Sequence, residues 1–502
     1  MTPEARLDPG APSPLYLQLQ RQLRGLIQRG EWRPGSRLPA VPELAARFAV
    51  HRLTVLKALA GLKRTGWITT VQGRGSFVAE RLPEPPLAVP LMPKAPRAED
   101  PAFPFEGSAA RVREDQLGPW LGETLGRQQD RHLVSFSAGF PPEDLLPGEA
   151  LARLTRQMLR ELGPEAWTYA EPAGHAPYLE AVRRWLEAEG APLAPGWGLR
   201  AIPGAQSGLA LAVEALTVPG DAVIVESPCY LGLLALLRAL DRVPIPVPVD
   251  RQGLDPERLA SVLQRHEAKL LVVVPSFHNP TGMTLSKARR ERILALTRAH
   301  GVTLVEDDSY GDLRFAGSPI PGFRRMEGAD HVIHLGTFSK SLAAGLRLGY
   351  AIAPEPVLER LAPLQEVHTI ALPTLTQAVV ARFLDTGGFH QHVTRLRRAL
   401  KARRDAMLEA IHAHFPEGTQ ATEPKGGMHL WVVLPEGISA LELHQEALRN
   451  GLGFAPGPLF FADGRGADCL RLNFSTHDPA VTREGIARLG DLIHSSRPRK
   501  HA

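Results

Sequence analysis

Residues 302–310 read VTLVEDDSY, and this stretch decides the class of the fold. An apolar, β-rich run that ends abruptly in polar residues is typical of a strand buried on both faces. Three further runs have the same form, namely AVIV at 222–225, LLVVV at 270–274 and VIHL at 332–335. A helical pattern follows each of them. The alternation of buried strands and helices predicts an α/β fold with a mostly parallel central sheet.

Polar segments follow the predicted strands, and they locate the functional site. They read ESPCY at 226–230, PSFHNPTG at 275–282, EDDSY at 306–310 and GTFSK at 336–340. Upstream, PGAQSG at 203–208 opens a helix that is rich in alanine and leucine. Ligands of parallel α/β sheets bind at the carboxyl ends of the strands. We therefore expect these segments to gather in one crevice.

The expected crevice contains the groups that pyridoxal 5'-phosphate requires. A helix N-terminus and an arginine bind a phosphate. A lysine amine forms a Schiff base with the aldehyde, and a carboxylate keeps the ring nitrogen protonated. A carboxylate such as Asp307, placed ~4 Å from a pyridinium, gains about 4 kcal/mol at an effective dielectric of ~20. Each residue alone is more often structural, so the combination and its order carry the prediction.

Four motifs resemble those of fold-type I aminotransferases, and most closely the branch that contains aminoadipate and aromatic aminotransferases. They are NPTG at 279–282, DDSY at 307–310, SK at 339–340 with an arginine seven residues after the lysine, and RLNFS at 471–475. The resemblance extends over residues 130–490. It implies pyridoxal phosphate as the cofactor, a large domain with a mostly parallel sheet, and a small domain.

The same resemblance implies a role for each candidate residue. Lys340 is the expected catalytic residue, which holds the cofactor as an internal aldimine and moves the proton. Asp307 pairs with the ring nitrogen, since it precedes Tyr310 by the spacing of the family, and Asp308 is the alternative. Arg471 forms a bidentate pair with the carboxylate of a substrate or effector. The remaining cofactor contacts are Asn279 and Tyr310 on the ring oxygen, Tyr230 on the ring face, Ala205, Gln206, Thr337, Ser339 and Arg347 on the phosphate, and Tyr169 on the phosphate from the partner subunit of a homodimer.

Charge is distributed unevenly along the chain. The net charge is +5, but residues 1–81 hold 13 Lys and Arg against 5 Asp and Glu, while the rest holds 45 against 48. Eight prolines within residues 83–104 exclude a helix or a central strand there, and we interpret 82–112 as an extended linker. A basic head on a slightly acidic body predicts a polyanion as the partner of the head.

Patterns in the head predict three helices and a β-hairpin. Apolar residues recur at helical spacing within 15–27, 42–48 and 51–65, and two strand-like runs at 67–71 and 76–79 flank a turn. LYLQL at 15–19, PGSRLP at 34–39, ELAA at 43–46, RLTV at 52–55 and QGRGSFV at 72–78 resemble the GntR-type winged helix-turn-helix. The resemblance covers residues 14–80 and implies binding to double-stranded operator DNA. The expected DNA contacts are His51, Arg52, Thr54, Gly73 and Arg74.

Three positions of the head depart from the GntR pattern. Pro42 stands where the family usually has an arginine, His51 replaces a small hydroxyl residue, and Leu56 replaces a residue that is often basic. The predicted base readout therefore rests on Arg52 and Thr54, with Arg74 in the wing.

The order of the parts resembles that of MocR/GabR-type regulators. The predicted domains are a DNA-binding head at 1–81, a linker at 82–112 and a pyridoxal phosphate-binding body at 113–502. Within the body we place a large subdomain at about 165–365 and a small one at about 113–164 with 366–496. The implied function is a bacterial transcription regulator that senses an amino compound or pyridoxal phosphate itself. An active aminotransferase with an appended head is the alternative, because no residue of the catalytic set is missing.

Composition excludes several other classes. Two cysteines, Cys229 and Cys469, exclude a disulfide scaffold or a cysteine-rich metal site. The first ten residues carry no apolar signal-peptide core, and no apolar run approaches the ~18 residues of a membrane span. His390 and His392 have no acidic or cysteine neighbour, and we place both on a helix surface. We expect a cytoplasmic protein without a metal centre.

Overall fold

The computed structural model describes residues 15–28, 31–64, 66–71, 75–80, 133–137, 139–141 and 143–496. The chain divides into two compact units, Met1–Val89 and Pro90–Ala502, which we call the head and the body. The predicted linker at 82–112 lies outside the described residues, as do Gly73 and Arg74. None of the described helices is both long and apolar enough to cross a membrane.

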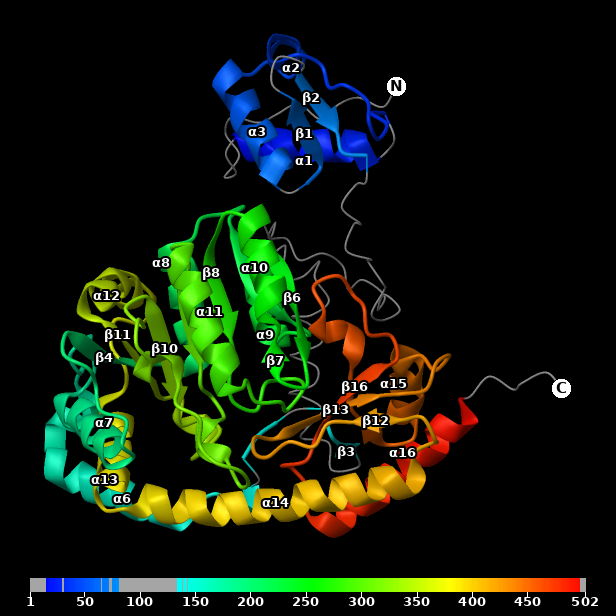
Figure 1. Ribbon diagram of the computed structural model, residues 1–502. Coiled ribbons are helices and arrows are strands. Elements are labelled where there is room, and N and C mark those ends of the chain that lie inside the picture. The colour runs from blue at the N-terminus through cyan, green and yellow to red at the C-terminus, as the bar shows by residue number, and fades with distance from the viewer. Residues whose placement is uncertain are drawn as a thin grey trace, which may run out of the picture. The chain divides into compact units, whose positions relative to one another are not determined.

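The described part of the head consists of three helices and a hairpin (Figure 1). Helix α1 spans Leu15–Gln28, α2 spans Val41–Arg47 and α3 spans Arg52–Arg64, and strands β1 (Ile68–Val71) and β2 (Gly75–Val78) pair antiparallel. The predicted helices and hairpin are confirmed. Pro42 lies in the first turn of α2, where its missing N–H removes no helical hydrogen bond. One core holds the head together, and it includes the fully buried Leu19, Leu23, Leu44, Val55 and Leu62.

In the described part of the body, an eight-stranded sheet of order β4-β11-β10-β9-β8-β5-β6-β7 forms the centre. The pairs from β10 through β9, β8 and β5 to β6 are parallel, whereas β11 runs antiparallel to both β10 and β4. The predicted mostly parallel sheet is confirmed. The strands are β4 (Trp197–Ile202), β5 (Ala222–Ser227), β6 (Val243–Asp250), β7 (Gly253–Leu254), β8 (Ala268–Val273), β9 (Thr303–Asp307), β10 (Val332–Thr337) and β11 (Gly349–Pro354).

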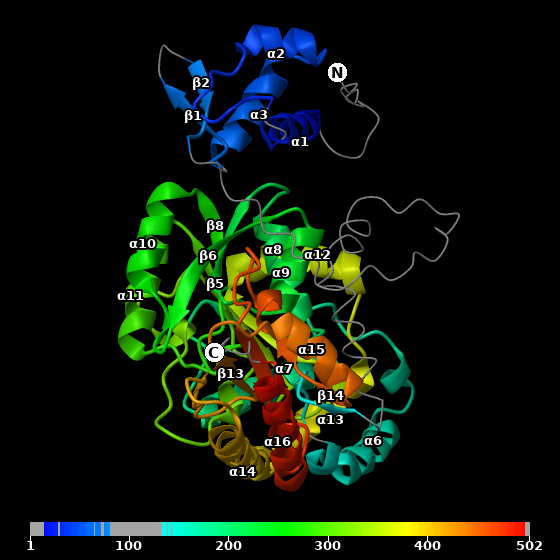
Figure 2. The ribbon, with the colours of Figure 1, turned by 90° about the vertical axis from the view of Figure 1, so that its right-hand side faces the viewer.

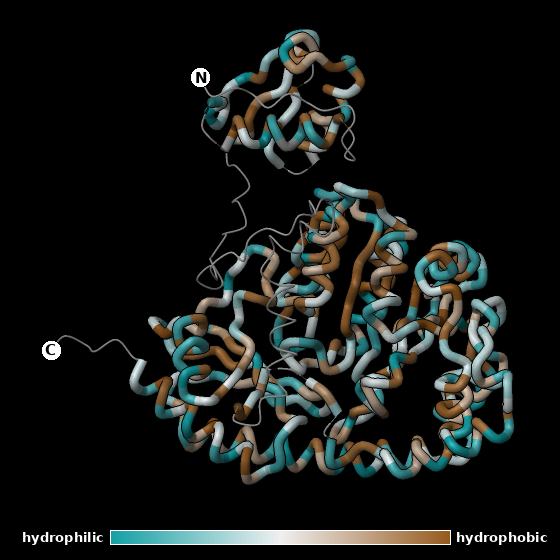
Figure 3. The backbone as a smooth tube through the Cα atoms, turned by 180° about the vertical axis from the view of Figure 1, so that it is seen from behind, coloured by the Kyte–Doolittle hydropathy of each residue, from teal (hydrophilic) through white to brown (hydrophobic). Residues whose placement is uncertain are grey.

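Helices cover both faces of this sheet (Figure 2). Helices α8 (Ala205–Leu216), α9 (Leu231–Ala239) and α12 (Glu355–Thr369) cover one face, and α10 (Pro256–Arg265) and α11 (Lys287–Ala299) cover the other. Val223 and Val225 of β5 pack with α8 and α9, while the intervening Ile224 packs with α10 and α11. Alternate residues of a strand are therefore both buried, which explains the continuous apolar runs. Figure 3 shows these strands as hydrophobic along most of their length.

A smaller antiparallel sheet of order β12-β13-β16-β15 forms the other part of the body, again among the described residues. Its strands are β12 (Gln420–Ala421), β13 (His429–Val433), β15 (Ala455–Pro456) and β16 (Cys469–Asn473), and helices α15 (Ala440–Arg449) and α16 (Pro479–Ser495) accompany it. Nearby, β3 (Val134–Ser135) pairs with β14 (Leu452–Gly453). The long helix α14 (Gly388–His414) runs beneath both parts of the body (Figure 1).

Two helices that the sequence analysis assigns to the small subdomain share a core with strands of the large sheet. Helix α13 (Thr374–Asp385) packs against both α6 (Gly148–Leu162) and α7 (Ala176–Ala188), and all three share one core with β4 and β11. The sequence-based boundaries place α6 and α13 in the small subdomain. Phe389 and Val393 at the start of α14 belong to the same core, and the boundary between the subdomains stays a prediction.

The prediction for the two histidines of α14 is half wrong. The His390 side chain is exposed, but His392 is only 2% exposed and lies beside the Phe383 ring of α13. Its position one turn from the buried Phe389 places it on the inner face of α14. Burial lowers the pKa of His392 to about 4, so that it is neutral.

Candidate functional site

A cavity of about 340 Å³ lies at the carboxyl ends of the parallel strands, as the rule for such sheets predicts. Segments that follow β4, β5, β8, β9 and β10 line one side, and β13 and β16 of the small sheet contribute to the other. We call it the Lys340 cavity. Of the predicted cofactor and substrate residues it gathers Ala205, Gln206, Tyr230, Asn279, Asp307, Tyr310, Thr337, Ser339, Lys340, Arg347 and Arg471.

Lys340 follows β10 and points its amine into this cavity. Its Nζ donates a hydrogen bond to the Gly139 carbonyl at 2.7 Å and lies 5.3 Å from the centroid of the Phe140 ring. Burial lowers the pKa of Lys340 to about 8, and the nearby Arg471 acts in the same direction. A pKa near 8 leaves much more neutral amine near neutral pH than an ordinary lysine has. Only the neutral amine is a nucleophile, so this lysine is suited to react with an aldehyde.

Asp307 ends β9 and is the carboxylate of the cavity. Its Oδ1 accepts hydrogen bonds from the backbone N–H of Ser309, at 3.1 Å, and from the Ser309 hydroxyl. Burial raises the pKa of Asp307 to about 6, against the opposing effect of these hydrogen bonds. The Ser309 hydrogen bonds and the nearby Lys340 only partly offset the cost of burying the charged form. Asp308, the alternative candidate, lines a different cavity.

Arg471 brings a buried cation from β16. Its Nη1 donates to the Asn279 side-chain carbonyl at 2.9 Å, its Nη2 donates to the Ser137 carbonyl, and its carbon Cζ lies 4.9 Å from the centre of the Phe460 ring. Its Nε has no hydrogen-bond partner among the described residues. Burial lowers the pKa of Arg471 to about 10, so that it stays charged at neutral pH. A buried cation with a spare donor is suited to a carboxylate ligand.

Tyr310 presents a phenol between two partners. Asn279 donates from Nδ2 to the Tyr310 oxygen at 3.4 Å, and His429 Nε2 lies 3.2 Å from the same oxygen. Burial raises the pKa of Tyr310 well above its usual value, so the phenol keeps its proton at neutral pH. Burial also raises the pKa of Tyr230, on the same cavity, to about 12.

His429 is a site residue that the sequence analysis missed. Burial lowers its pKa well below the usual value, so it meets Tyr310 as a neutral ring. It reaches the cavity because β13 pairs with β16, with His429 opposite Asn473 of the recognised RLNFS motif. Only the strand pairing reveals this, since the two residues lie far apart in the chain.

The N-terminus of α8 forms a cradle for an anion. Gly204 precedes the helix with a φ of +86°, and a Cβ there would lie 3.3 Å from Arg347 Nη2 and 3.6 Å from Ser339 Oγ. Arg347 donates to Ser339 Oγ at 3.4 Å and to the Pro203 carbonyl at 3.1 Å. The first N–H groups of a helix have no helical acceptor. Such N–H groups next to an arginine and a hydroxyl suit a phosphate.

Tyr169 is the predicted cofactor contact that lies outside the cavity. Its side chain is 79% exposed, and its backbone forms an isolated bridge with Pro373. The structure contains one chain, so the expected contact with the partner subunit stays a prediction.

The DNA-contact candidates of the head lie at the start of α3. The Leu53 N–H donates to His51 Nδ1 at 3.2 Å, so His51 caps the helix. Arg52 is exposed, and Thr54 is half-buried. Leu53 and Leu56 are 61% and 50% exposed. The exposed face of α3 thus combines a cation with apolar groups.

The Lys340 cavity fits the predicted pyridoxal phosphate. The Gly204 cradle suits its phosphate, Asp307 suits its ring nitrogen, and Lys340 suits its aldehyde. The unpartnered Nε of Arg471 leaves a donor for a further carboxylate.

Two protein families match the chain, and together they cover most of it. The family of aminotransferase class I and II matches residues 131–489, and the bacterial regulatory proteins of the gntR family match residues 15–78. The 2-aminoadipate transaminase of Thermus thermophilus is 34% identical over 78% of this chain and 96% of its own length. The HTH-type transcriptional regulator TauR of Rhodobacter capsulatus is 30% identical over 97% of this chain and 98% of its own length.

A solved structure resembles the body. It is that of LysN, the α-aminoadipate aminotransferase of Thermus thermophilus, complexed with N-(5'-phosphopyridoxyl)-L-leucine. Its TM-score is 0.71 and its sequence identity 33%, with coverage of 78% of this chain and 97% of that chain.

Proposed function

We propose that this chain, which belongs to the MocR/GabR-type family, senses an amino compound in the Lys340 cavity and thereby controls operator DNA binding by the head. In this family a GntR-type head is fused to a class I and II aminotransferase domain. Its cofactor is pyridoxal 5'-phosphate. One observation carries the proposal: the similarity to the regulator TauR spans 97% of the chain, head and body together. A regulator of bacterial operators works in the cytoplasm, which we propose as its location.

The proposed mechanism begins with how the body holds its cofactor. When bound, pyridoxal phosphate supplies an aldehyde that reacts with primary amines and a ring that withdraws electrons. The N–H groups of Ala205 and Gln206, with Thr337, Ser339 and Arg347, would bind the phosphate, since all five residues line the cavity. Asp307 would keep the proton on the ring nitrogen, Asn279 and Tyr310 would hydrogen-bond to the ring oxygen, and Tyr230 would lie against the ring. Lys340 supplies the amine that attaches the cofactor.

The proposed effector is a primary amine that also carries a carboxylate. Its carboxylate would take the spare donor of Arg471, and its amine would then lie in the same cavity as Lys340. Binding at Arg471 changes its hydrogen bond to Asn279, which follows β8 of the large sheet, and its hydrogen bond to the Ser137 carbonyl. If DNA affinity differs between the two arrangements, effector and operator affect each other's affinity equally. In a homodimer, two heads read two half-sites.

The proposal is tested by the DNA binding of the purified, cofactor-loaded full chain. Labelled DNA from upstream of its own gene is titrated at several salt concentrations, with unlabelled random DNA as competitor. We expect saturable binding that survives the competitor, and a candidate amino acid that alters it. If the competitor or modest salt removes binding at every genomic fragment tested, the head binds DNA only through non-specific attraction to phosphates. That result would contradict the proposal.

A second candidate function is transamination, and the complete set in the Lys340 cavity favours it. Lys340, Asp307, Tyr310 and Arg471 line one cavity, as an amino transfer between an amino acid and a keto acid requires. The test is turnover of amino donors with keto acids by the loaded chain. Sustained turnover would make the protein an enzyme with a DNA-binding head, whereas a single spectral change without turnover supports the regulator.

A further inference from the structure

Another cavity, of about 720 Å³, lies on the far side of the β9 end and shares no lining residue with the Lys340 cavity. It is formed by the end of α7, by α11 and α14, and by two short 3-10 helices, Gly311–Leu313 and Phe323–Arg325. We call it the arginine cavity. Nothing in the proposed function uses it.

The lining of the arginine cavity is cationic. It contains five guanidinium groups and three carboxylates, which are Arg290, Arg314, Arg324, Arg325 and Arg397 against Glu189, Asp308 and Asp312. Arg290 lies 4.0 Å from the buried Glu306. For Arg314, Arg324, Arg325 and Arg397, no carboxylate of the described residues lies within ion-pair distance.

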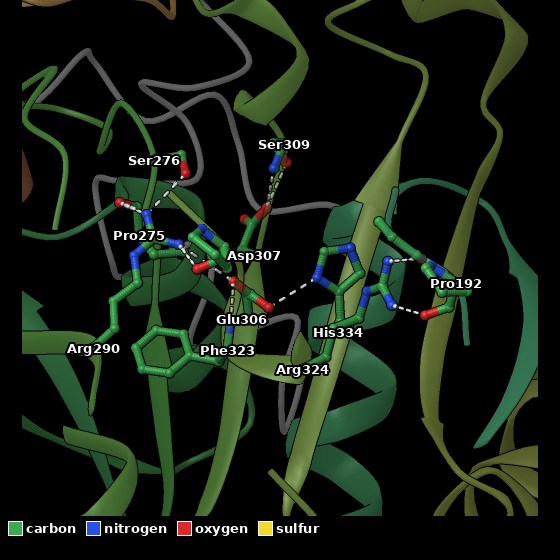
Figure 4. Close-up of polar contacts among 12 residues, drawn as sticks. Pro192, Pro275, Ser276, Arg290, Glu306, Asp307, Ser309, Phe323, Arg324 and His334 are labelled. Atoms are coloured by element: carbon green, nitrogen blue, oxygen red, sulfur yellow. Dashed lines mark hydrogen bonds and ion pairs between the residues drawn. The ribbon is translucent and has the colours of Figure 1, made fainter. Parts of the chain in front are cut away.

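Two of these arginines are structural (Figure 4). Arg290 is fully buried and donates to the Pro275 carbonyl at 2.9 Å and to Ser276 Oγ at 3.2 Å. Arg324 donates to the Pro192 carbonyl at 3.1 Å. Between them, Glu306 accepts from the Phe323 N–H and pairs with His334 (Figure 4). These groups are satisfied by the protein itself and form a rigid floor.

Arg314 and Arg325 do not have structural contacts of this kind. Neither side chain makes a hydrogen bond or an ion pair with a described residue. The Arg314 guanidinium stacks 4.7 Å from the centroid of the Phe277 ring. Burial lowers the pKa of Arg314, and its neighbour Arg290 acts in the same direction. A half-desolvated cation beside another cation gains from an anionic partner.

Asp308 connects this cavity with the other. Its Oδ1 is buried and has no hydrogen-bond partner among the described residues. Its backbone N–H donates to the Leu335 carbonyl of β10 at 2.9 Å, so the main chain there is fixed. The preceding residue, Asp307, lines the Lys340 cavity. Consecutive carboxylates of one strand end therefore face separate cavities.

We propose that the arginine cavity binds a small, multiply charged oxyanion, a metabolite with phosphate or carboxylate groups, through Arg314 and Arg325. The volume suits a metabolite, since ligand sites usually measure about 300–1,000 Å³. The excess of guanidinium over carboxylate sets the sign of the ligand charge, and the spare oxygen of Asp308 accepts a hydroxyl or amino hydrogen of the ligand. The bound oxyanion changes the surroundings of Asp308 and, through it, the field at Asp307.

Calorimetric titration of the cofactor-loaded full chain tests the binding, at constant ionic strength. Inorganic pyrophosphate and succinate are the two probes, and they distinguish phosphate from carboxylate recognition. The loaded cofactor already fills the phosphate cradle of the Lys340 cavity, so that cradle does not compete. We expect saturable binding of at least one probe. Absence of saturable heat with both would overturn the proposal.

Three variants locate the binding. Arg325→Gln removes an exposed side chain that makes no hydrogen bond or ion pair with a described residue and keeps the fold, while Arg314→Gln removes the stacked guanidinium. We expect each variant to bind the probe at least about tenfold more weakly, because each loses a charge-assisted hydrogen bond. Arg251→Gln, an exposed arginine outside the cavity, is the matched control and leaves binding unchanged. Equal affinity in all four proteins would place the anion elsewhere.

The link to the Lys340 cavity has its own readout, the visible absorption band of the bound cofactor. We expect the probe to shift this band in the native chain. Asp308→Asn, compared at saturating probe, should reduce this shift, since it removes the carboxylate next to Asp307 but none of the arginines. A probe that binds without any shift would refute the link, whatever the DNA binding of the head.

Discussion

The head and the body use arginine in opposite surroundings. Arg52 of α3 is exposed and makes no hydrogen bond with a described residue, whereas Arg471 of the body is 4% exposed and lies among Asn279, Ser137 and an aromatic ring. Salt screens an exposed cation, and the affinity of such cations for a large polyanion depends on how many of them contact it. A buried cation acts on one small anion in fixed geometry. The comparison predicts salt-sensitive binding by the head and selective binding by the body.

Removing Lys340 from the cavity of the body is expected to have the largest effect of the changes considered. Lys340→Ala deletes the buried amine, so the visible absorption band of attached pyridoxal phosphate should disappear and the response to any amino effector with it. DNA binding without effector should stay within about threefold, because the head has its own core. Absorption spectra and DNA titrations check this.

Lys401→Ala is the control for that variant. Lys401 is an exposed lysine of α14 that pairs with Asp405 of the same helix. It should keep both the band and the response. An effector response that persists in Lys340→Ala would refute attachment at Lys340 as the sensing step.

Changing the head should leave the body untouched. Arg52→Gln is expected to weaken operator binding by about 1–3 kcal/mol, or roughly 5- to 150-fold, if the guanidinium reads a base edge. The absorption band of the loaded chain should not change. If binding instead weakens equally on operator and random DNA, with a smaller salt dependence, Arg52 contacts phosphate rather than a base.

The sequence predicted the sheet and the site for one physical reason. Parallel strands buried on both faces leave continuous apolar runs, and their polar carboxyl ends must meet at one edge. Asp307 and Lys340 could be placed together because each directly follows such a run. The hairpin and helices of the head were predictable because their patterns are local.

Features that depend on non-local pairing were not predicted. Strand β6 has the sequence VPIPVPVD, and its three prolines argue against a strand when the sequence alone is considered. The prolines, Pro244, Pro246 and Pro248, stand at every second position. Their missing N–H groups all point to one side, and β6 pairs there only with the two-residue β7 at its end. Proline at every second position is tolerated at the edge of a sheet. His429 and the arginine cavity likewise arise from contacts between distant segments.

The proposed phosphate cradle of the body depends on Gly204, which precedes α8. Gly204→Ala places a Cβ 3.3 Å from Arg347 Nη2, at a φ of +86°. We expect about a tenfold loss of pyridoxal phosphate affinity, from backbone strain of about 1–2 kcal/mol and the displaced guanidinium. Gly301→Ala has a similar φ of +65° but no neighbour within 4 Å, so it controls for strain alone. Equal affinity of both variants for pyridoxal phosphate would show that the cradle does not bind the phosphate.

The smallest effect concerns the stability of the cofactor-free body, and it follows from the pKa of Asp307 near 6. Between an unfolded pKa of about 3.9 and a folded pKa of about 6, the native state binds more protons, so stability falls as pH rises through this window. Above pH 6 the full penalty is present. Asp307→Asn removes it but loses part of the Ser309 contacts, so a net gain of about 1–2 kcal/mol is expected.

Thermal unfolding of the cofactor-free protein at several pH values checks this sign. The midpoint of Asp307→Asn should exceed that of the native chain by about 2–4 °C at pH 7, and the difference should vanish near pH 4. With cofactor bound the order should reverse, because the carboxylate then faces a protonated ring nitrogen. An exposed carboxylate of the body, Glu257, carries no such burial penalty, so Glu257→Gln should leave the midpoint unchanged at both pH values. A gain that is the same at pH 4 and pH 7 would show that the buried charge of Asp307 does not destabilise the empty site.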